Sequence, residues 1–170
     1  MRAAIITIST SVAAGRSEDR SGAALADLAA GAGVEVVARE TVSDDAQKIE
    51  QLLRRYAAPE ADTPLIFTTG GTGLTPDDVT PEATRAVIDR DAPGFAEAMR
   101  AESLKHTPMG ILTRGVSGIA GRTLIVNFPG NPKAIHELFG IVAPTLEHAV
   151  ATLRREPGKA VNHGAGHVGH

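Results

Sequence analysis

The segment TTGGTGLTPDDVTPEAT, residues 68–84, places three glycines and two adjacent acids directly after an apolar run. Gly70, Gly71 and Gly73 permit positive backbone dihedral angles, and inward-turned N–H groups then form an anion-binding concavity without a charged side chain. The spacing is not that of a P-loop, because the lysine is missing, and it is not a dinucleotide fingerprint. The glycines therefore form either a tight turn or a phosphate site of another kind.

Asp77 and Asp78 stand just before Pro81, which is expected in the first turn of a helix that Thr80 would cap. One explanation is that these acids stabilise the helix N-terminus, by about 0.3–1 kcal/mol. If both faced a phosphate instead, repulsion between unit charges roughly 4 Å apart would cost about 4 kcal/mol at an effective dielectric constant near 20. A cation would have to intervene, and Mg²⁺ takes carboxylate and phosphate oxygens together. A nucleotide·Mg²⁺ site and a simple helix start thus both remain open.

Two further loops have the same ambiguity. Asp44 and Asp45 could be first-turn acids of a helix capped by Ser43, or they could bind a cation beside Asp78. The segment PGNPKA, residues 129–134, could be a stiff turn into a helix, or Asn131 with its neighbouring lysine could hold a substrate anion at the helix N-terminus.

The elements that must position these loops alternate along the chain. Apolar, β-branched runs predict strands at 3–9, 34–42, 64–69 and 123–128. Helices are predicted at 19–30, 46–58, 80–91, 93–107 and 133–156, the last bent at Pro144, and 110–119 is expected to form a strand or an irregular hairpin. This alternation indicates an α/β fold with a mainly parallel sheet between helical layers. Ligands bind outside the carboxyl ends of such strands, so the polar loops should converge on one crevice.

Composition narrows the function. The 170 residues are 42% hydrophobic and 22% charged, as expected for one globular domain, which we place at 1–156 with a flexible tail at 157–170. A net charge of -3 argues against nucleic-acid binding, and cysteine is absent, which excludes disulfides and thiolate zinc sites. MRAAIITIST suggests a first strand rather than a signal peptide, and no apolar run approaches the ~20 residues that span a bilayer, so we expect a cytoplasmic protein that does not bind membranes.

The chain resembles the MoaB/Mog family of molybdenum-cofactor biosynthesis proteins over about residues 3–155, and the related domain of gephyrin. Five segments carry the resemblance, in the order TISTSVAAGRSEDRSG, SDDAQKI, TTGGTGLTPDDVTPEAT, SLKHTPMGILTRGVSGIAG and TLIVNFPGNPKA. It implies a three-layer α/β/α sandwich, commonly a homotrimer, which transfers the adenylyl group of Mg·ATP to molybdopterin and releases pyrophosphate. A molybdenum insertase is an implied partner.

The resemblance also implies roles for individual residues. Asp44 and Asp78 correspond to the essential acids, which would hold Mg²⁺ directly or through water. The residues that would bind phosphate or substrate are Gly70, Gly71, Thr72, Gly73, Asp19, Ser21, Gly22, Pro129, Gly130 and Asn131.

Two positions depart from the family pattern. Thr10 stands where many relatives have aspartate, and Asp77 stands where many have an arginine that would face phosphate. Compensating positive charge could come from Lys133, Arg16, Arg20 or Arg114. The departures leave an alternative function open, that of a catalytically silent carrier of molybdopterin.

Overall fold

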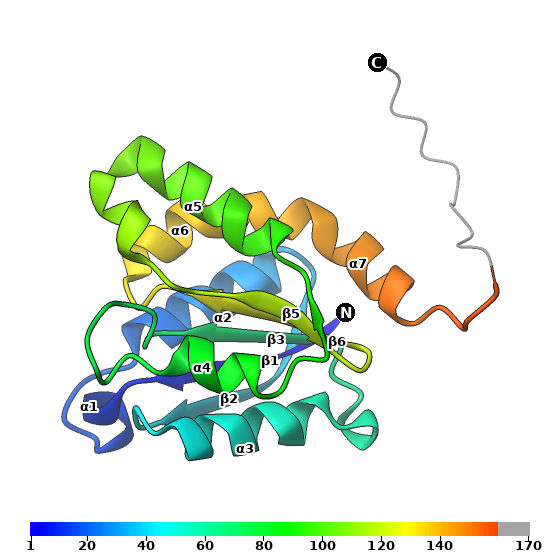
Figure 1. The fold of residues 1–170 in the computed structure, drawn as a ribbon, viewed down its shortest axis with the longest axis horizontal. Helices are drawn as coiled ribbons and strands as arrows, with labels where there is room; N and C mark the ends of the chain where they lie inside the picture. The colour runs from blue at the N-terminus through cyan, green and yellow to red at the C-terminus, as the bar shows by residue number, and fades with distance from the viewer. Residues whose placement is uncertain (160–170) are drawn as a thin grey trace.

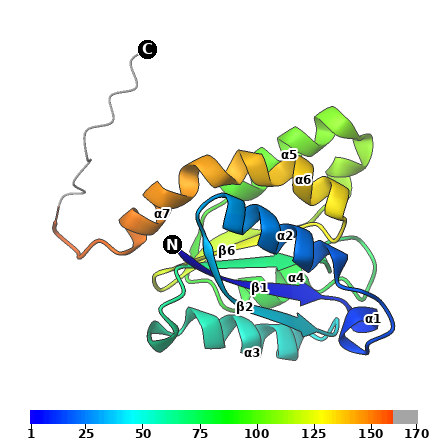
Figure 2. The same cartoon turned by 180° about the vertical axis from the view of Figure 1, so that it is seen from behind.

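A six-stranded sheet forms the middle layer of the molecule, and helices cover both of its faces (Figures 1 and 2). This computed structural model describes residues 1–159. The strands are β1 (Arg2–Ile8), β2 (Glu35–Val42), β3 (Leu65–Thr69), β4 (Arg90–Asp91), β5 (Ser117–Ala120) and β6 (Thr123–Phe128). Their order is β2-β1-β3-β6-β5-β4, and only β5 runs against its neighbours. The predicted three-layer α/β fold with a mostly parallel sheet is confirmed.

Helices pack on each face because the central strands are apolar on both sides. The α-helices are α1 (Thr10–Ala13), α2 (Arg20–Gly31), α3 (Ala46–Ala57), α4 (Thr80–Arg85), α5 (Gly94–His106), α6 (Pro132–Val142) and α7 (Leu146–Leu153). Three short 3-10 helices are η1 (Pro59–Ala61), η2 (Pro108–Leu112) and η3 (Ala143–Thr145). One core lies under α2, α5, α6 and α7, where Phe67 meets Phe128 edge-on at 5.7 Å; the other lies under α3 and α4. None of the helices within residues 1–159 is long and apolar enough to cross a membrane.

Most predicted elements appear within a few residues of their expected bounds, and the bend at Pro144 is the helix η3. The helix predicted at 80–91 is wrong in its second half, because α4 ends at Arg85 and Arg90–Asp91 pairs with β5 as β4. Residues 110–119 divide between η2 and β5, which is antiparallel to β6. The tail predicted at 157–170 lies outside the described residues from 160 onward.

The loops singled out in the sequence all follow parallel strands. β2, β1, β3 and β6 are neighbours in the sheet and run in the same direction, so their carboxyl ends meet at one edge, drawn beside α1 in Figure 1. The four loops therefore share one edge of the sheet, as expected, and their meeting in one crevice stays a prediction.

A buried polar network supports this edge from beneath. The amide of Asn127 in β6 accepts a hydrogen bond from the N–H of Val116 at 3.1 Å, and donates to the hydroxyls of Thr68 at 2.9 Å and Thr84 at 3.1 Å. Thr84 in turn donates to the carbonyl of Thr80 at 2.8 Å. The network joins β3, β6 and α4, and the side chains of Asn127, Thr68 and Thr84 are almost completely buried.

Replacing Asn127 by leucine should destabilise the fold by about 2–3 kcal/mol, because the Val116 N–H and two buried hydroxyls lose their partner. Thr84→Val removes one hydroxyl from the same network and should cost about 1 kcal/mol. Urea unfolding monitored by circular dichroism measures both. Equal stability of the wild type and Asn127→Leu would contradict the role assigned to this network.

Candidate active site

Gly70 and Gly71 form a turn that only glycine can make. Gly70 has φ of 95° and Gly71 has φ of 65°. A Cβ atom on Gly70 would lie 2.3 Å from the carbonyl oxygen of Ile8, and one on Gly71 would lie 2.3 Å from the hydroxyl of Thr80. The turn is thus pressed against the end of β1, and the expectation of positive dihedral angles holds for these two glycines.

Gly73 has a different reason to be glycine. It is not among the residues with positive φ, but a Cβ atom there would lie 2.8 Å from Oδ2 of Asp78. Its N–H donates to the Asp78 carboxylate, and the N–H of Gly70 donates to the carbonyl of Phe128 at 3.3 Å. Two of the three predicted phosphate-binding glycines thus already have acceptors for their N–H groups.

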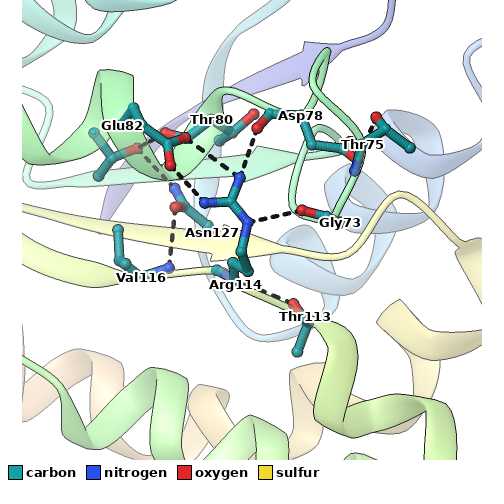
Figure 3. A network of polar contacts seen from close by, with 11 residues as sticks. Gly73, Thr75, Asp78, Thr80, Glu82, Thr113, Arg114, Val116 and Asn127 are labelled. Atoms are coloured by element: carbon teal, nitrogen blue, oxygen red, sulfur yellow. Dashed lines mark hydrogen bonds and ion pairs between the residues drawn. The ribbon is translucent and has the colours of Figure 1, made fainter.

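Asp78 is held by the loop that it closes. Its Oδ2 accepts the N–H of Thr75 at 2.9 Å and the hydroxyl of Thr75 at 2.8 Å (Figure 3). Partial burial alone would raise the pKa of Asp78, but the hydrogen bonds from Thr75 and Gly73, together with the charge of Arg114, outweigh burial and lower it. The carboxylate is therefore stabilised as an anion.

The helix-start explanation does not account for Asp78. The residue before α4 is Val79, no side chain caps this helix, and the hydroxyl of Thr80 donates instead to the carbonyl of Gly70 at 2.9 Å. The prediction that Thr80 caps the helix is therefore wrong, because this hydroxyl fastens the glycine turn. Asp77 is exposed on the loop between β3 and α4.

Asp44 is held in the same way by Thr10 on the other side of the site. Its Oδ2 accepts the N–H of Thr10 at 2.9 Å and the hydroxyl of Thr10 at 2.8 Å, and the N–H of Asp44 donates back to that hydroxyl at 3.1 Å. Asp45, not Ser43, caps α3 by accepting the N–H of Lys48 at 3.1 Å. The two explanations of this acid pair therefore separate: Asp45 starts the helix, and Asp44 faces the end of β1.

The segment Asp19–Gly22 begins α2. Asp19 caps the helix by accepting the N–H of Gly22 at 2.9 Å, and its second oxygen accepts from Thr7 at 3.1 Å and Arg39 at 3.3 Å. A Cβ atom on Gly22 would lie 2.3 Å from Asp19 Oδ2 and from Thr7 Oγ1, whereas Ser21 is half-buried in the first turn. The structure thus gives Asp19 and Gly22 a structural role at the same edge of the sheet.

The PGNP loop, residues 129–132, lies directly against the glycine turn. Thr69 donates its hydroxyl to the carbonyl of Pro129 at 2.8 Å, and a Cβ atom on Gly130 would lie 3.2 Å from the Cα of Gly70. Asn131 caps α6 by accepting the N–H of Lys133 at 2.9 Å. Asn131 therefore begins the helix, and its role in holding a substrate anion stays a prediction, while Gly130 permits the close approach of the two loops.

The four candidate cations differ in availability. The guanidinium of Arg114 donates to the carbonyls of Gly73 and Asp78 and to the carboxylate of Glu82, and Arg20 pairs with Glu18. Within residues 1–159, Arg16 and Lys133 form no ion pair, and both are exposed. Of the four candidates, Arg16 and Lys133 therefore offer free positive charge, whereas Arg114 does not.

The acids suit an ion that arrives with a nucleotide better than a resident metal. No group of three or more histidines, aspartates or glutamates within residues 1–159 could hold a metal ion by itself. Mg²⁺ commonly uses one or two carboxylates and completes its shell with waters and substrate phosphates. Asp44 and Asp78 fit that pattern, and both belong to loops at the same sheet edge.

A pocket of about 170 Å³ opens beside the PGNP loop, between α5, η2 and α6. Its walls are mostly apolar, with hydrogen-bonding groups among them. Its lining includes Met99, Ser103, Thr113, Gly115, Asn127 and Pro129. The edge of the sheet therefore offers two adjoining features, a loop region with acids and glycines and a pocket with apolar walls.

The fold and the sequence are similar to those of known proteins. The crystal structure of the molybdopterin biosynthesis enzyme MoaB from Thermus thermophilus matches with a TM-score of 0.84 and 45% identity, covering 93% of this chain and 99% of the other. The family described as probable molybdopterin binding domain matches residues 4–148. This chain belongs to the MoaB/Mog family. The family resemblance of the sequence is thereby confirmed.

Two relatives named for molybdenum-cofactor synthesis or molybdopterin adenylylation are also similar. The molybdopterin adenylyltransferase of Escherichia coli K12 is 40% identical over 139 residues, which cover 81% of this chain and 71% of the relative. The molybdenum cofactor synthesis protein cinnamon of Drosophila melanogaster is 45% identical over 109 residues, 64% of this chain but only 18% of the relative. The MoaB/Mog domain thus occurs both as most of a protein and as a small part of a longer one.

The ion pair between Glu82 and Arg114 should make stability depend on pH. The hydrogen bond from Arg114 lowers the pKa of Glu82 below its ordinary value of 4.5. The stabilising contribution is therefore complete above pH 4.5 and is lost as the pH falls through the lower folded-state pKa. Urea unfolding measures the free energy of unfolding of the wild type and of Glu82→Gln. The difference between the two values should be constant near neutral pH and shrink in acid. Glu35→Gln, at an exposed position on β2, is the control, and a difference that grows in acid would contradict the assignment.

Proposed function

We propose that this chain adenylylates molybdopterin with Mg·ATP. A terminal phosphate oxygen of molybdopterin attacks the α-phosphorus of ATP, a new P–O bond forms, and the bond to the bridging oxygen breaks as pyrophosphate leaves with the electron pair. The observation that carries this proposal is the convergence of Asp44, Asp78 and the glycine turn at one sheet edge in a MoaB/Mog domain. Such a transfer depends on positioning and charge stabilisation and needs no protein nucleophile.

The main chain after β3 supplies the phosphate contacts in this proposal. The N–H groups of Gly70 and Gly73 already have acceptors, so we expect those of Gly71 and Thr72 to donate to the nucleotide. Asp44 and Asp78 would hold Mg²⁺, directly or through water, with the remaining positions taken by waters and phosphate oxygens. The ion would neutralise the charge that develops on the departing pyrophosphate.

Molybdopterin would occupy the pocket beside the PGNP loop. The apolar walls, which include Met99 and Pro129, suit the flat faces of a pterin, and Ser103 and Thr113 provide hydrogen-bonding groups. Pro129 lines the pocket while Gly130 touches Gly70, so the two substrates would meet across the PGNP loop.

The family resemblance also supports proposals about assembly and location. We infer a homotrimer, and exposed apolar side chains at the end of α5 and in η2 offer a contact surface: Leu104 is 50%, Met109 62% and Ile111 71% exposed. Sedimentation velocity measures the assembly. A molybdenum insertase partner and a cytoplasmic location remain predictions from the sequence.

The decisive experiment is release of pyrophosphate from Mg·ATP by the purified protein, with and without molybdopterin. We expect release only when molybdopterin is present. Asp44→Asn and Asp78→Asn should each lower turnover by about 10²-fold or more, because each removes a charge proposed to bind Mg²⁺, while circular dichroism shows an intact fold. Full turnover in both variants would contradict the role of the acids.

The carrier alternative gives a different result in the same system. A silent carrier binds molybdopterin tightly, shows no ATP binding in the presence of Mg²⁺ and releases no pyrophosphate. Isothermal titration with each substrate separates this outcome from an active transferase.

Asp77 should weaken the binding of ATP, because an exposed carboxylate stands on the loop that would face its phosphates. Asp77→Asn removes one negative charge, and we expect the KM for ATP to fall about two- to fivefold with little change in kcat. Lys133→Ala should shift the KM in the opposite direction. The shifts in KM should diminish at high salt. An unchanged KM in both variants would show that neither side chain interacts with the bound ATP.

A further inference from the structure

Arg114 connects the loop that bears Asp78 to the rest of the site. Its N–H donates to the carbonyl of Thr72 at 2.8 Å, its Nε to the carbonyl of Gly73 at 2.8 Å, and its Nη2 to the carbonyl of Asp78 at 2.6 Å (Figure 3). Both ends of the 73–78 loop are thus joined to a single side chain. Glu82 in α4 accepts hydrogen bonds from Nη1 and Nη2 on the remaining side of the guanidinium, which fixes the orientation of that group.

The guanidinium is occupied by these contacts. It has five N–H donors, and the contacts to Gly73, Asp78 and Glu82 use four of them. The hydrogen bond to Glu82 raises the pKa of Arg114, so the side chain remains charged. Its place in the site is therefore to hold the loop rather than to bind a substrate phosphate.

The residues beside Arg114 face the other half of the site. Thr113 and Gly115 both line the pocket next to Pro129, while the Arg114 side chain between them reaches the loop. A Cβ atom on Gly115 would lie 3.1 Å from the carbonyl oxygen of Asn127, and the carbonyl of Gly115 accepts from Arg100 at 2.9 Å. This pocket wall is closely packed and anchored on both sides.

We propose that Arg114 is a positioning residue that fixes the Asp78 loop to the pocket wall and so sets the spacing between the nucleotide and the pterin. The inference rests on the proposed function for its kinetic consequence, but the clamp itself is a property of the loop. Without Arg114, each substrate keeps its own contacts while the reacting atoms lose their alignment. A misplacement of about 1 Å can cost 10²-fold in rate, so kcat should suffer more than either KM.

The test compares Arg114→Met, Arg114→Lys and a matched control, Arg122→Met, which changes an exposed arginine at the turn between β5 and β6. Hydrogen exchange of the segment 71–80 is measured first, without substrates. The amides of Asp78 and Thr80 donate to the carbonyls of Thr75 and Gly71. Both amides should exchange at least about tenfold faster in Arg114→Met and at the wild-type rate in the control. Pyrophosphate release then gives kcat and KM, and we expect kcat to fall about 10- to 100-fold with each KM within about threefold.

The Arg114→Lys variant distinguishes the planar geometry of the guanidinium from its positive charge. An ammonium group is a compact point donor and cannot reach the carbonyls of Gly73 and Asp78 and the Glu82 carboxylate in the fork geometry, so Arg114→Lys should remain close to Arg114→Met in both measurements. Wild-type exchange and kcat in either Arg114 variant would overturn the inference. An inactive wild type would refute the proposed function instead, while the exchange measurement would still decide whether Arg114 holds the loop.

Discussion

The turn after β3 has main chain on two sides and no room for side chains. Gly70 lies against the carbonyl of Ile8 at the end of β1 and against Gly130 from the loop after β6. Three neighbouring strand ends are therefore in contact through backbone alone, and the position of the turn is fixed by steric exclusion. Thr80, Asp78 and Arg114 are all placed relative to this turn by hydrogen bonds to its own atoms or to the loop that continues from it.

Two site carboxylates are held by the same device on opposite sides of the turn. A threonine gives both its N–H and its hydroxyl to Oδ2 of each acid, Thr10 for Asp44 and Thr75 for Asp78. Hydrogen bonds to a charged acceptor are stronger than those between neutral groups, so they orient the carboxylate as well as stabilise its charge. Thr10, which the sequence alone suggests is a departure from the family pattern, is therefore a partner of Asp44 in this chain.

Local patterns predict most of the fold. Buried apolar runs identify β1, β3 and β6, because a strand covered on both faces must be apolar throughout. The explanation of Asp45 as a helix start is also correct, because its hydrogen-bond partner Lys48 lies only three residues away. The end of α4 could not be predicted, since it depends on pairing between β4 and the distant β5. The same holds for Arg114, whose side-chain partners lie 32 to 41 residues away. Thr75 carries no signal, because nothing in its type marks it as the partner of Asp78.

The two edges of the sheet limit how copies of this domain can associate. β4 has only two residues, both exposed and charged, while the opposite edge strand β2 exposes Glu35, Arg39 and Thr41. Short or charged edge strands discourage the addition of a further strand. Continuous sheets across subunits, and the fibrillar aggregation that such pairing can seed, are therefore disfavoured. Copies of this domain would therefore associate through helices and loops. Subunits joined in this way can dissociate while each sheet stays intact.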